Sequence, residues 1–495
     1  MGPKRLVHAG RRWPLECSFP PVRWGSGRCA WASLSSIPRA GDAVQRFRPL
    51  PPVDRGGSGR KRIPSTREPH FTMAHGGVWN PGRFHAGGRM KAGVGYSNGE
   101  NSYSCGKAAA EGAVQTGGIR RPGLVFAFCH GNHDHRAFLG GLRSVVGDSV
   151  PVVGGSSIGV ITNNDLSYER FPTGVAVLEA GGINCRVGSA GDVNLDERAA
   201  GKKLAERFAL IEKDRLFLLF YDSIKAPSDG RGPPLLNAST PLIEGVASGL
   251  DSRIPIIGAG LLGDYGFGPT QQFCGSHVSS QSAVGVSLDV DFHVRIMHGC
   301  TPLDGVYRSI TKMEGSTIYE LDGRPIVEVI DELYGNTEWR KSYPVALLTL
   351  GQNHGPRFGA YREDRYVNRL ITGVLPDGRG VNIFEPDFEC GSEIQFMLRD
   401  SGKMIKSARK NSSGLMRHIT EEAGRKPLFG LYIDCAGRSG GCSNTASEEA
   451  AEVQDVFNRY GVPLLGFYSG VEIAPLLRRS RGLDWTGVLL VLTGE

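Results

Sequence analysis

The sequence predicts an α/β fold in which repeated strand–helix–strand–strand units form layered sheets flanked by helices, in two domains. Three observations lead to this fold class. Continuous apolar runs of five or six residues recur, and such runs are typical of strands buried on both faces of a sheet. Segments long enough for helices of about three turns separate these runs. The same order of elements also occurs three times along the chain, which indicates an internal repeat.

Each repeat contains a first strand, a helix, a second strand and a last strand. The expected elements, in that order, are residues 123–128, 137–145, 150–159 and 174–179; then 216–221, 241–249, 254–263 and 283–288; then 428–433, 448–460, 462–470 and 487–492.

The second strand of each repeat carries one shared pattern, in which an apolar residue and Pro precede two apolar residues and Gly. Its three copies are residues 150–154, 254–258 and 462–466. Proline is tolerated at the start of a strand, and we expect the glycine where the chain leaves the sheet. Ligands of open α/β sheets bind beyond the carboxyl ends of strands, so the Gly- and Ser-rich turns that follow are expected to line a binding site.

Residues 303–425 have an alternation of their own between the second and third repeats. We expect strands at 306–313, 317–321 and 345–350, a helix at 326–333, and a hairpin over 370–384 that turns at Pro376-Asp377-Gly378. A domain boundary is expected near Cys300 to Asp304, which divides the chain into domains of residues 90–302 and 303–492.

The basic excess of the chain lies at its beginning. Residues 1–89 hold 16 Lys and Arg against four acidic residues, so the remainder carries a formal charge of −5 although the whole chain carries +7. This stretch is rich in Arg, Gly, Pro and Ser, and we expect it to be disordered. An organelle transit peptide, a nucleic-acid-binding tail and translated sequence upstream of the true start are all consistent with it; we favour the last, with Met90 as the start and Met73 as second choice.

The remaining composition excludes several classes of protein. No apolar run approaches the ~20 residues of a membrane-spanning helix, so no membrane partner is expected. The acidic remainder lacks a nucleic-acid-reading motif, so no nucleic-acid partner is expected. The ten cysteines lack the spacing of a zinc site or a disulfide framework, which favours a protein that is not secreted.

A cluster of histidines follows the first predicted strand. His130, His133 and His135 lie close to Asp134, and such a set could bind zinc or iron. Their spacing on a short turn makes simultaneous ligation awkward, and Asp134 could instead cap the next helix. We favour the cap, and we expect no metal and no cofactor.

Two further strings resemble a known family. Residues 150–159 (VPVVGGSSIG) are similar to the small-residue turn of FIST N-terminal domains, and residues 434–438 (DCAGR) with 465–475 (LGFYSGVEIAP) resemble the signature of FIST C-terminal domains. The resemblance covers about residues 90–492. Residues 483–486 (LDWT) depart from the polar element that usually follows in that family.

The resemblance implies a cytoplasmic sensory module that binds a small molecule, such as an amino acid, and passes the signal to a separate signalling protein. It implies no catalytic activity. The expected ligand-binding residues are Gly154, Gly155, Ser156, Ser157, Asp434, Cys435, Arg438, Tyr468 and Glu472.

Arg438 and the nearby carboxylates have two interpretations. A guanidinium and a carboxylate at one crevice would suit the two charges of an amino acid. Alternatively, Arg438 and Glu472 form a salt bridge that joins two strand ends.

Catalysis and scaffolding remain alternatives. Cys435 could act as a nucleophile with a histidine such as His354. No nucleophile elbow or Walker loop is present, and the glycines of residues 258–263 do not lead into a helix, so no dinucleotide site is expected. A protein-interaction scaffold is the third reading.

Overall fold

The computed structural model describes residues 90–495 except 182–183, 209–213, 228–233, 252, 343–344, 346, 444 and 446. The expected disorder and the alternative origins of residues 1–89 lie outside the described residues.

Three units of one plan make up most of the described chain. The first contains β1 (Ala92–Asn98), α1 (Ser102–Gly117), β2 (Pro122–His130), α2 (His135–Val146), β3 (Val152–Ser157), β4 (Val160–Thr162), β5 (Leu166–Ser167) and β6 (Pro172–Glu179). The second contains β7 (Asn184–Ala190), α3 (Glu197–Ala205), β8 (Leu216–Asp222), β9 (Ile224–Ala226), β10 (Leu235–Leu236), α4 (Ser239–Ala247), β11 (Ile256–Leu261), β12 (Gln272–Cys274), β13 (His277–Ser279) and β14 (Ala283–Asp289). The third contains β15 (Asp291–Met297), α6 (Ser401–Arg417), β24 (Lys426–Cys435), α7 (Gly440–Ser443), α8 (Glu449–Tyr460), β25 (Leu464–Ser469), β26 (Val471–Leu476), β27 (Arg479–Leu483) and β28 (Gly487–Gly494).

Each unit builds the same four-stranded arrangement, which confirms the predicted α/β class and repeat. The strand orders are β1-β6-β2-β3, β7-β14-β8-β11 and β15-β28-β24-β25. In every unit a helix joins the two parallel strands, and the last strand runs antiparallel beside the first of them. The repeat is longer than predicted, since each unit also begins with an outer strand and a helix.

The units exchange hairpins. The hairpin β12–β13 of the second unit extends the first sheet at β3, β26–β27 of the third extends the second at β11, and β4–β5 of the first extends the third at β25. The exchange closes the three units into what we call the ring. No unit has its complete sheet without a neighbour, so the two predicted domains share sheets; their boundary near residue 302 stays a prediction.

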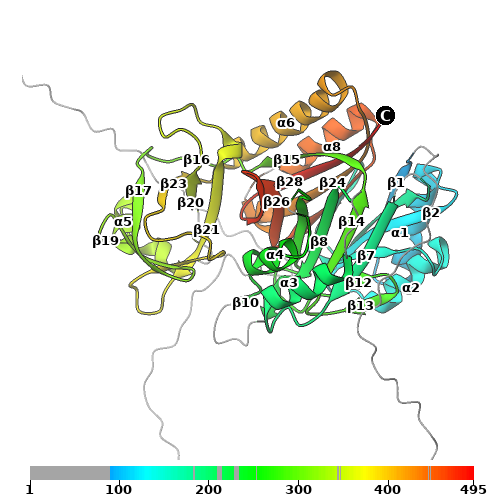
Figure 1. The fold of residues 1–495 in the computed structure, drawn as a ribbon, viewed down its shortest axis with the longest axis horizontal. Helices are drawn as coiled ribbons and strands as arrows, with labels where there is room; N and C mark the ends of the chain where they lie inside the picture. The colour runs from blue at the N-terminus through cyan, green and yellow to red at the C-terminus, as the bar shows by residue number, and fades with distance from the viewer. Residues whose placement is uncertain are drawn as a thin grey trace, which may run out of the picture.

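The sheets face inward and the helices cover them from outside. Phe128 and Phe467 stack in the central core with ring centroids 3.8 Å apart, and Phe126 packs on Phe429. Figure 1 shows three helix pairs around the outside of the sheets: α1 with α2, α3 with α4, and α6 with α8. Each sheet is thus buried on both faces, as the continuous apolar runs predict.

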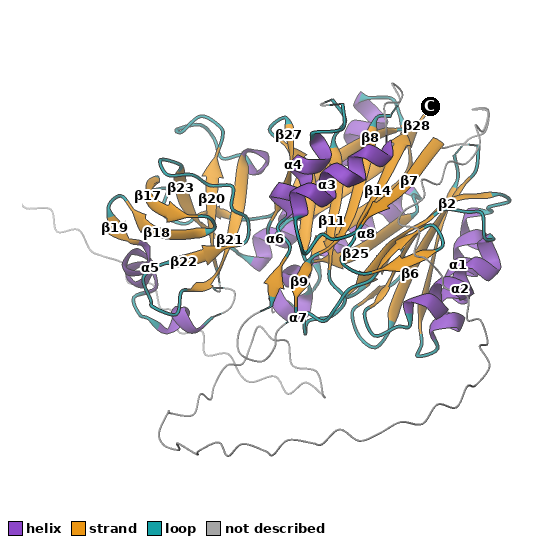
Figure 2. Ribbon diagram, turned by 60° about the horizontal axis from the view of Figure 1, so that its bottom comes forward, coloured by secondary structure: helices purple, strands orange, loops and turns teal. Residues whose placement is uncertain are grey.

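A small β-barrel is inserted in the third unit between β15 and α6. It comprises β16 (Thr301–Pro302), β17 (Arg308–Glu314), β18 (Thr317–Leu321), β19 (Arg324–Pro325), α5 (Ile326–Tyr334), β20 (Leu348–Asn353), β21 (Tyr366–Val374), β22 (Val381–Ile383) and β23 (Glu393–Leu398). The strand path closes because β23 pairs with both β17 and β20. Figure 2 shows the barrel beside the ring, with α5 at its end, in agreement with the predicted helix.

The glycine of the shared pattern does not lie where the chain leaves the sheet, so that expectation is wrong. Gly154, Gly258 and Gly466 lie inside β3, β11 and β25. A Cβ atom on these residues would lie 2.1, 1.8 and 2.8 Å from carbonyl oxygens of the neighbouring parallel strand. The glycines therefore permit close approach of two strands, and the Gly-Ser turn predicted over residues 154–157 is buried strand.

No helix within the described ranges is long and apolar enough to cross a membrane.

Candidate functional site

An apolar hollow lies where the second unit, the third unit and the barrel meet. The space between its lining atoms, open solvent included, is about 430 Å³, of which about 30 Å³ can hold the centre of a water molecule. The lining residues are Ser223, Leu236, Leu262, Phe267, Leu370, Phe384, Cys435, Ala436, Gly437, Ser469, Gly470 and Trp485. Strands β8, β11, β24 and β25 end at this hollow, so it occupies the position beyond carboxyl strand ends where α/β sheets bind ligands.

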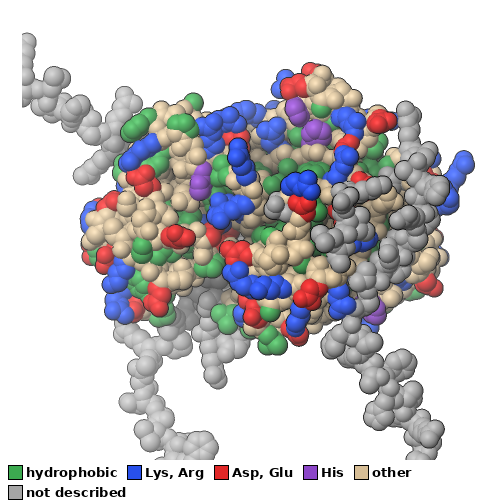
Figure 3. All heavy atoms as spheres, in the orientation of Figure 1, with side chains coloured by type: hydrophobic (Ala, Val, Ile, Leu, Met, Phe, Trp, Pro, Cys, Tyr) green, Lys and Arg blue, Asp and Glu red, His purple; other side chains and the backbone are tan. Residues whose placement is uncertain are grey.

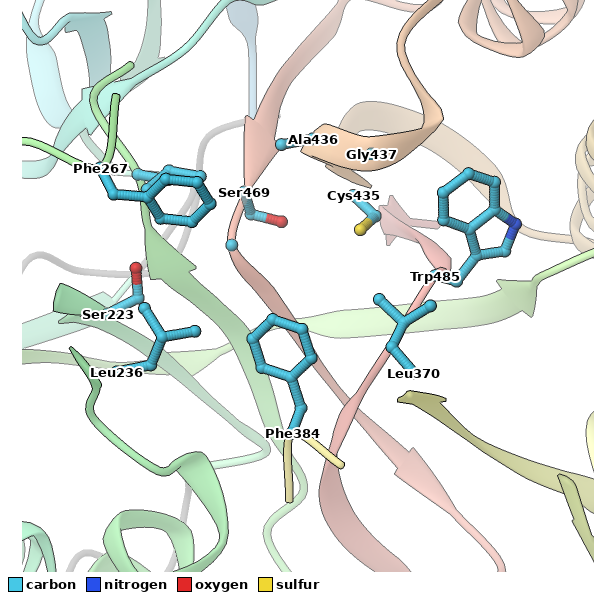
Figure 4. Close-up of a pocket in the computed structure, with 12 residues that line it drawn as sticks. Ser223, Leu236, Phe267, Leu370, Phe384, Cys435, Ala436, Gly437, Ser469 and Trp485 are labelled. Carbon is cyan, nitrogen blue, oxygen red and sulfur yellow. The ribbon is translucent and has the colours of Figure 1, made fainter. Parts of the chain in front are cut away.

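Few polar groups interrupt the apolar lining. Figure 4 shows the side chains of Cys435, Ser469, Ser223 and Phe384 around the same space. The Ser469 hydroxyl donates to Glu472 Oε1 at 2.8 Å, and the Ser223 hydroxyl donates to the carbonyl of Leu261. The indole Nε1 of Trp485 is buried, and no described residue accepts a hydrogen bond from it. Figure 4 shows the indole nitrogen on the edge of the ring that points away from Cys435, so the hollow offers mostly apolar surface and two hydroxyl oxygens.

Cys435 reaches the hollow but lacks the surroundings of an activated nucleophile. Burial, and next the nearby Glu472, raise the pKa of its thiol well above the usual range. A low pKa is what makes a cysteine reactive. His354 lies near Arg479, Arg481 and Asp387, none of which lines the apolar hollow.

Arg438 is held in a buried ion-pair network behind the hollow. Its guanidinium donates to both carboxylate oxygens of Glu449, and Nη1 also donates to the carbonyls of His298 at 3.0 Å and Trp485 at 2.8 Å. Asp434 Oδ1 lies 3.2 Å from Arg438 Nε. The predicted bridge from Arg438 to Glu472 is wrong, because these other partners satisfy the guanidinium.

Two carboxyl groups near Arg438 have pKa values raised above the usual range. Burial, followed by repulsion from Glu449, raises the pKa of Asp434 well above its usual range. Burial likewise raises the pKa of Glu472, whose oxygens accept from Ser469 Oγ and from the Thr486 amide at 3.2 Å. Asp434, Arg438 and Glu472 are all fully buried and none of them lines the hollow. An amino-acid-binding role for them stays a prediction.

The other expected ligand-binding residues lie in β3 and β25. Gly154 and Gly155 are buried in β3. Ser156 Oγ lies 2.8 Å from Nε2 of His135, and Ser157 Oγ donates to the carbonyl of Tyr468 at 3.3 Å. The Tyr468 hydroxyl donates to Glu448 at 3.1 Å. None of these residues lines the hollow, so of the nine only Cys435 does.

The sequence patterns did not predict most of the residues that line the apolar hollow. Leu370 and Phe384 come from the barrel and Phe267 from a loop of the second unit. Trp485 lies in the LDWT segment that departs from the family signature, and this departure was the one available signal.

Asp134, within the histidine cluster, caps a helix. Asp134 precedes α2 and accepts from the amides of Arg136 and Ala137, which confirms the predicted cap. His133 Nδ1 lies 3.0 Å from Ser102 Oγ. Across the described ranges, no group of three or more His, Cys, Asp and Glu side chains is placed to hold a metal ion.

The protonation of Asp484, next to Trp485, should make the stability of the protein depend on pH. It accepts from the Leu370 amide at 2.9 Å, and burial raises its pKa to about 7. The pKa of an aspartate in the unfolded chain is ~4, so between about pH 4 and 7 the folded protein binds more protons than the unfolded chain. The free energy of unfolding therefore falls as the pH rises from about 4 to 7. In Asp484→Asn, the free energy of unfolding should fall less steeply over this range. The difference in slope from the wild type should reach up to about 1.4 kcal/mol per pH unit. Urea unfolding at several pH values measures both slopes; identical slopes would contradict the assignment.

Two protein-family models match the chain. The FIST N domain model matches residues 123–324, and the FIST C domain model matches residues 327–475. The chain belongs to the FIST family. The FIST N match contains the first two parallel strand pairs and the barrel strands β16 to β18, and the FIST C match contains the barrel strands β20 to β23 and the third pair. FIST domains are proposed sensory and signalling modules.

Comparisons with individual proteins add little. No curated protein matches the chain. A chorismatase crystal structure is 10% identical, with 83% of this chain and 100% of that chain covered and a TM-score of 0.28. PurLQS from Thermotoga maritima is 12% identical, with 82% and 72% covered and a TM-score of 0.20. Alignments this weak support no conclusion about fold or activity.

Proposed function

We propose that this FIST protein is a cytoplasmic sensory module that binds a small, largely apolar molecule in the apolar hollow and is not an enzyme. The observation that carries the proposal is the lining itself, to which two ring units and the barrel all contribute. A ligand in such a place contacts all three parts at once, so its binding favours one arrangement of the barrel on the ring. A separate signalling protein then reads that arrangement.

The chemistry of the lining supports an uncharged or weakly polar ligand group. Leu236, Leu370 and Phe384 offer apolar contact, and the hydroxyl oxygens of Ser223 and Ser469 can accept a hydrogen bond. A ligand hydroxyl or N–H near these oxygens would donate to them. Apolar amino acids remain candidates through their side chains, although Arg438, next to the lining residue Gly437, is already satisfied by Glu449.

The surroundings of Cys435 support binding rather than catalysis. A thiol whose pKa is raised by burial is mostly protonated at neutral pH and is a poor nucleophile. The mostly apolar lining supplies no second catalytic group beside it.

Blocking the hollow tests this function. Leu236→Trp places a larger side chain into the lining, whereas Leu235→Trp, on the same short strand, changes a residue that is 61% exposed. Thermal unfolding is measured with L-leucine, L-phenylalanine and indole as probes, because a molecule bound only by the folded state raises the melting temperature. We expect a saturable increase for at least one probe in the wild type and in Leu235→Trp, and none in Leu236→Trp.

Two results would contradict the proposal. Equal increases in both variants would place binding outside the apolar hollow. No increase with any probe would favour the scaffold alternative, in which the barrel and ring present a surface to another protein.

A further inference from the structure

A second hollow, different in character, lies between α4, β27 and the barrel. It encloses about 620 Å³, part of it open to solvent, and its lining is mostly polar. The lining residues are Thr240, Ile243, Glu244, Pro386, Asp387, Glu389, Arg479, Ser480 and Arg481. It shares no lining residue with the apolar hollow, and we call it the arginine hollow.

Arg481 is buried in this hollow without an adequate partner. Its side chain is only 9% exposed, and its buried Nε has no hydrogen-bond partner among the described residues. The nearest carboxylate oxygen, Asp387 Oδ2, lies 3.7 Å from Nη1, beyond hydrogen-bond distance. A buried guanidinium normally has its donors satisfied, so this arrangement requires an explanation.

The carboxylate of Asp387 is already engaged elsewhere. Arg369 donates to Oδ1 from Nε at 2.7 Å and to Oδ2 from Nη2 at 2.5 Å. Because this bidentate pair satisfies Asp387, little of its charge remains for Arg481. Burial, followed by repulsion from Arg479, lowers the pKa of Arg481 to about 10, so the side chain still carries its charge at neutral pH.

Two neighbours extend the positive, donor-rich wall. Arg479 is exposed and forms no ion pair with any described residue. Ser480 Oγ accepts from the Ile256 amide at 2.8 Å, which leaves its own hydroxyl hydrogen available to donate. The charges of both arginines also act on His354. Its pKa is lowered first by burial and then by repulsion from Arg481 and Arg479.

Acidic groups stand on the other walls but do not neutralise Arg481. Glu385 accepts from the amides and hydroxyls of Ser239 and Thr240 at the start of α4. Glu244 is paired with Arg198, and Glu389 lies on the exposed rim. The space beside Arg481 therefore has an unused donor and a positive charge whose nearest counter-charge among the described residues, Asp387, is 3.7 Å away and shared with Arg369.

We propose that the arginine hollow binds the oxyanion group of a small molecule, a carboxylate or a phosphate, between Arg481 and Arg479. The planar fork of a guanidinium matches both groups and binds them more strongly than neutral donors do. A partly enclosed site limits screening of this attraction by solvent. The acidic rim of Glu244 and Glu389 disfavours ligands with many negative charges.

A ligand bound in the arginine hollow would also affect how the barrel packs against the ring. Thr240 belongs to the second unit, Arg481 to the third, and Asp387 to the barrel. On the face drawn in Figure 3, Lys and Arg side chains are interspersed with acidic ones, and several lie where the barrel adjoins the ring. A bound oxyanion would tie the three parts together, independently of any ligand in the apolar hollow.

Calorimetric titration of the full chain with inorganic phosphate and with malonate, at constant ionic strength, tests the proposal. The variants are Arg481→Gln and Arg479→Gln, with Arg478→Gln as the control that removes an equal charge from an exposed neighbour outside the lining. All share the basic residues 1–89, so a difference between variants reports the hollow and not that segment. Circular dichroism verifies that each variant is folded.

We expect at least one anion to bind the wild type and Arg478→Gln with affinities within about twofold, and to bind the other two variants about tenfold or more weakly. Binding of phosphate alone or malonate alone identifies the oxyanion class. Absence of binding to the wild type at millimolar anion, or equal binding by Arg479→Gln and Arg478→Gln, overturns the proposal. The comparison of these two exposed positions stands even if Arg481→Gln does not fold.

Discussion

Replacing Arg438 by methionine is expected to lower the free energy of unfolding by about 3 to 5 kcal/mol. Arg438 is fully buried and holds the carboxylates of Glu449 and Asp434. Methionine would leave these fully buried acids without a counter-charge. It would also leave the carbonyls of His298 and Trp485 without their donor.

Urea unfolding measures this loss, and an exposed arginine supplies the control. Arg409 pairs with Glu452 but is 68% exposed, so Arg409→Met should lower the free energy of unfolding by less than about 1 kcal/mol. Adding Glu449→Gln to Arg438→Met should recover part of the stability, because it removes one of the uncompensated acids. Equal losses in Arg438→Met and Arg409→Met would contradict the importance of the buried network.

Gly154→Ala is expected to destabilise the protein by about 2 to 5 kcal/mol, from two causes that act together. Gly154 has φ of 125°, a conformation that alanine rarely adopts. The added Cβ would also lie 2.1 Å from the carbonyl oxygen of Ala127, which belongs to the rigid parallel neighbour β2. One strand or the other must move, and both are buried.

Gly147→Ala separates the two causes. Gly147 also has a positive φ, 91°, but a Cβ there meets no atom within 4 Å. Its loss of stability should reflect backbone strain alone, about 1 to 3 kcal/mol. Thermal and urea unfolding of both variants give the difference. If Gly154→Ala were no worse than Gly147→Ala, the close approach of β2 and β3 would not explain the glycine.

Local patterns in the sequence carried much of the fold. The apolar runs of the three repeats became the parallel strand pairs because strands buried on both faces must be continuously apolar. Asp134 was predictable as a cap, since a cap acts within one turn of its own helix. The FIST family itself was predicted from short strings around Asp434 and Tyr468, and the family comparison confirms it.

Contacts between distant segments decided the rest. The exchanged hairpins are joined to other units by backbone hydrogen bonds, which any sequence with a free strand edge can form and which leave no local pattern.

The partners of Arg438 and the position of Phe384 depended in the same way on which distant side chains arrive nearby. Arg438 and Glu472 each follow a predicted strand, yet Glu449 takes the guanidinium because α8 packs over β24. The sequence by itself determined which segments are strands, helices and caps and which family they form. Only the tertiary structure decided where the two hollows lie and which charges remain unpaired, because burial and charge compensation are properties of whole surroundings, not of single segments.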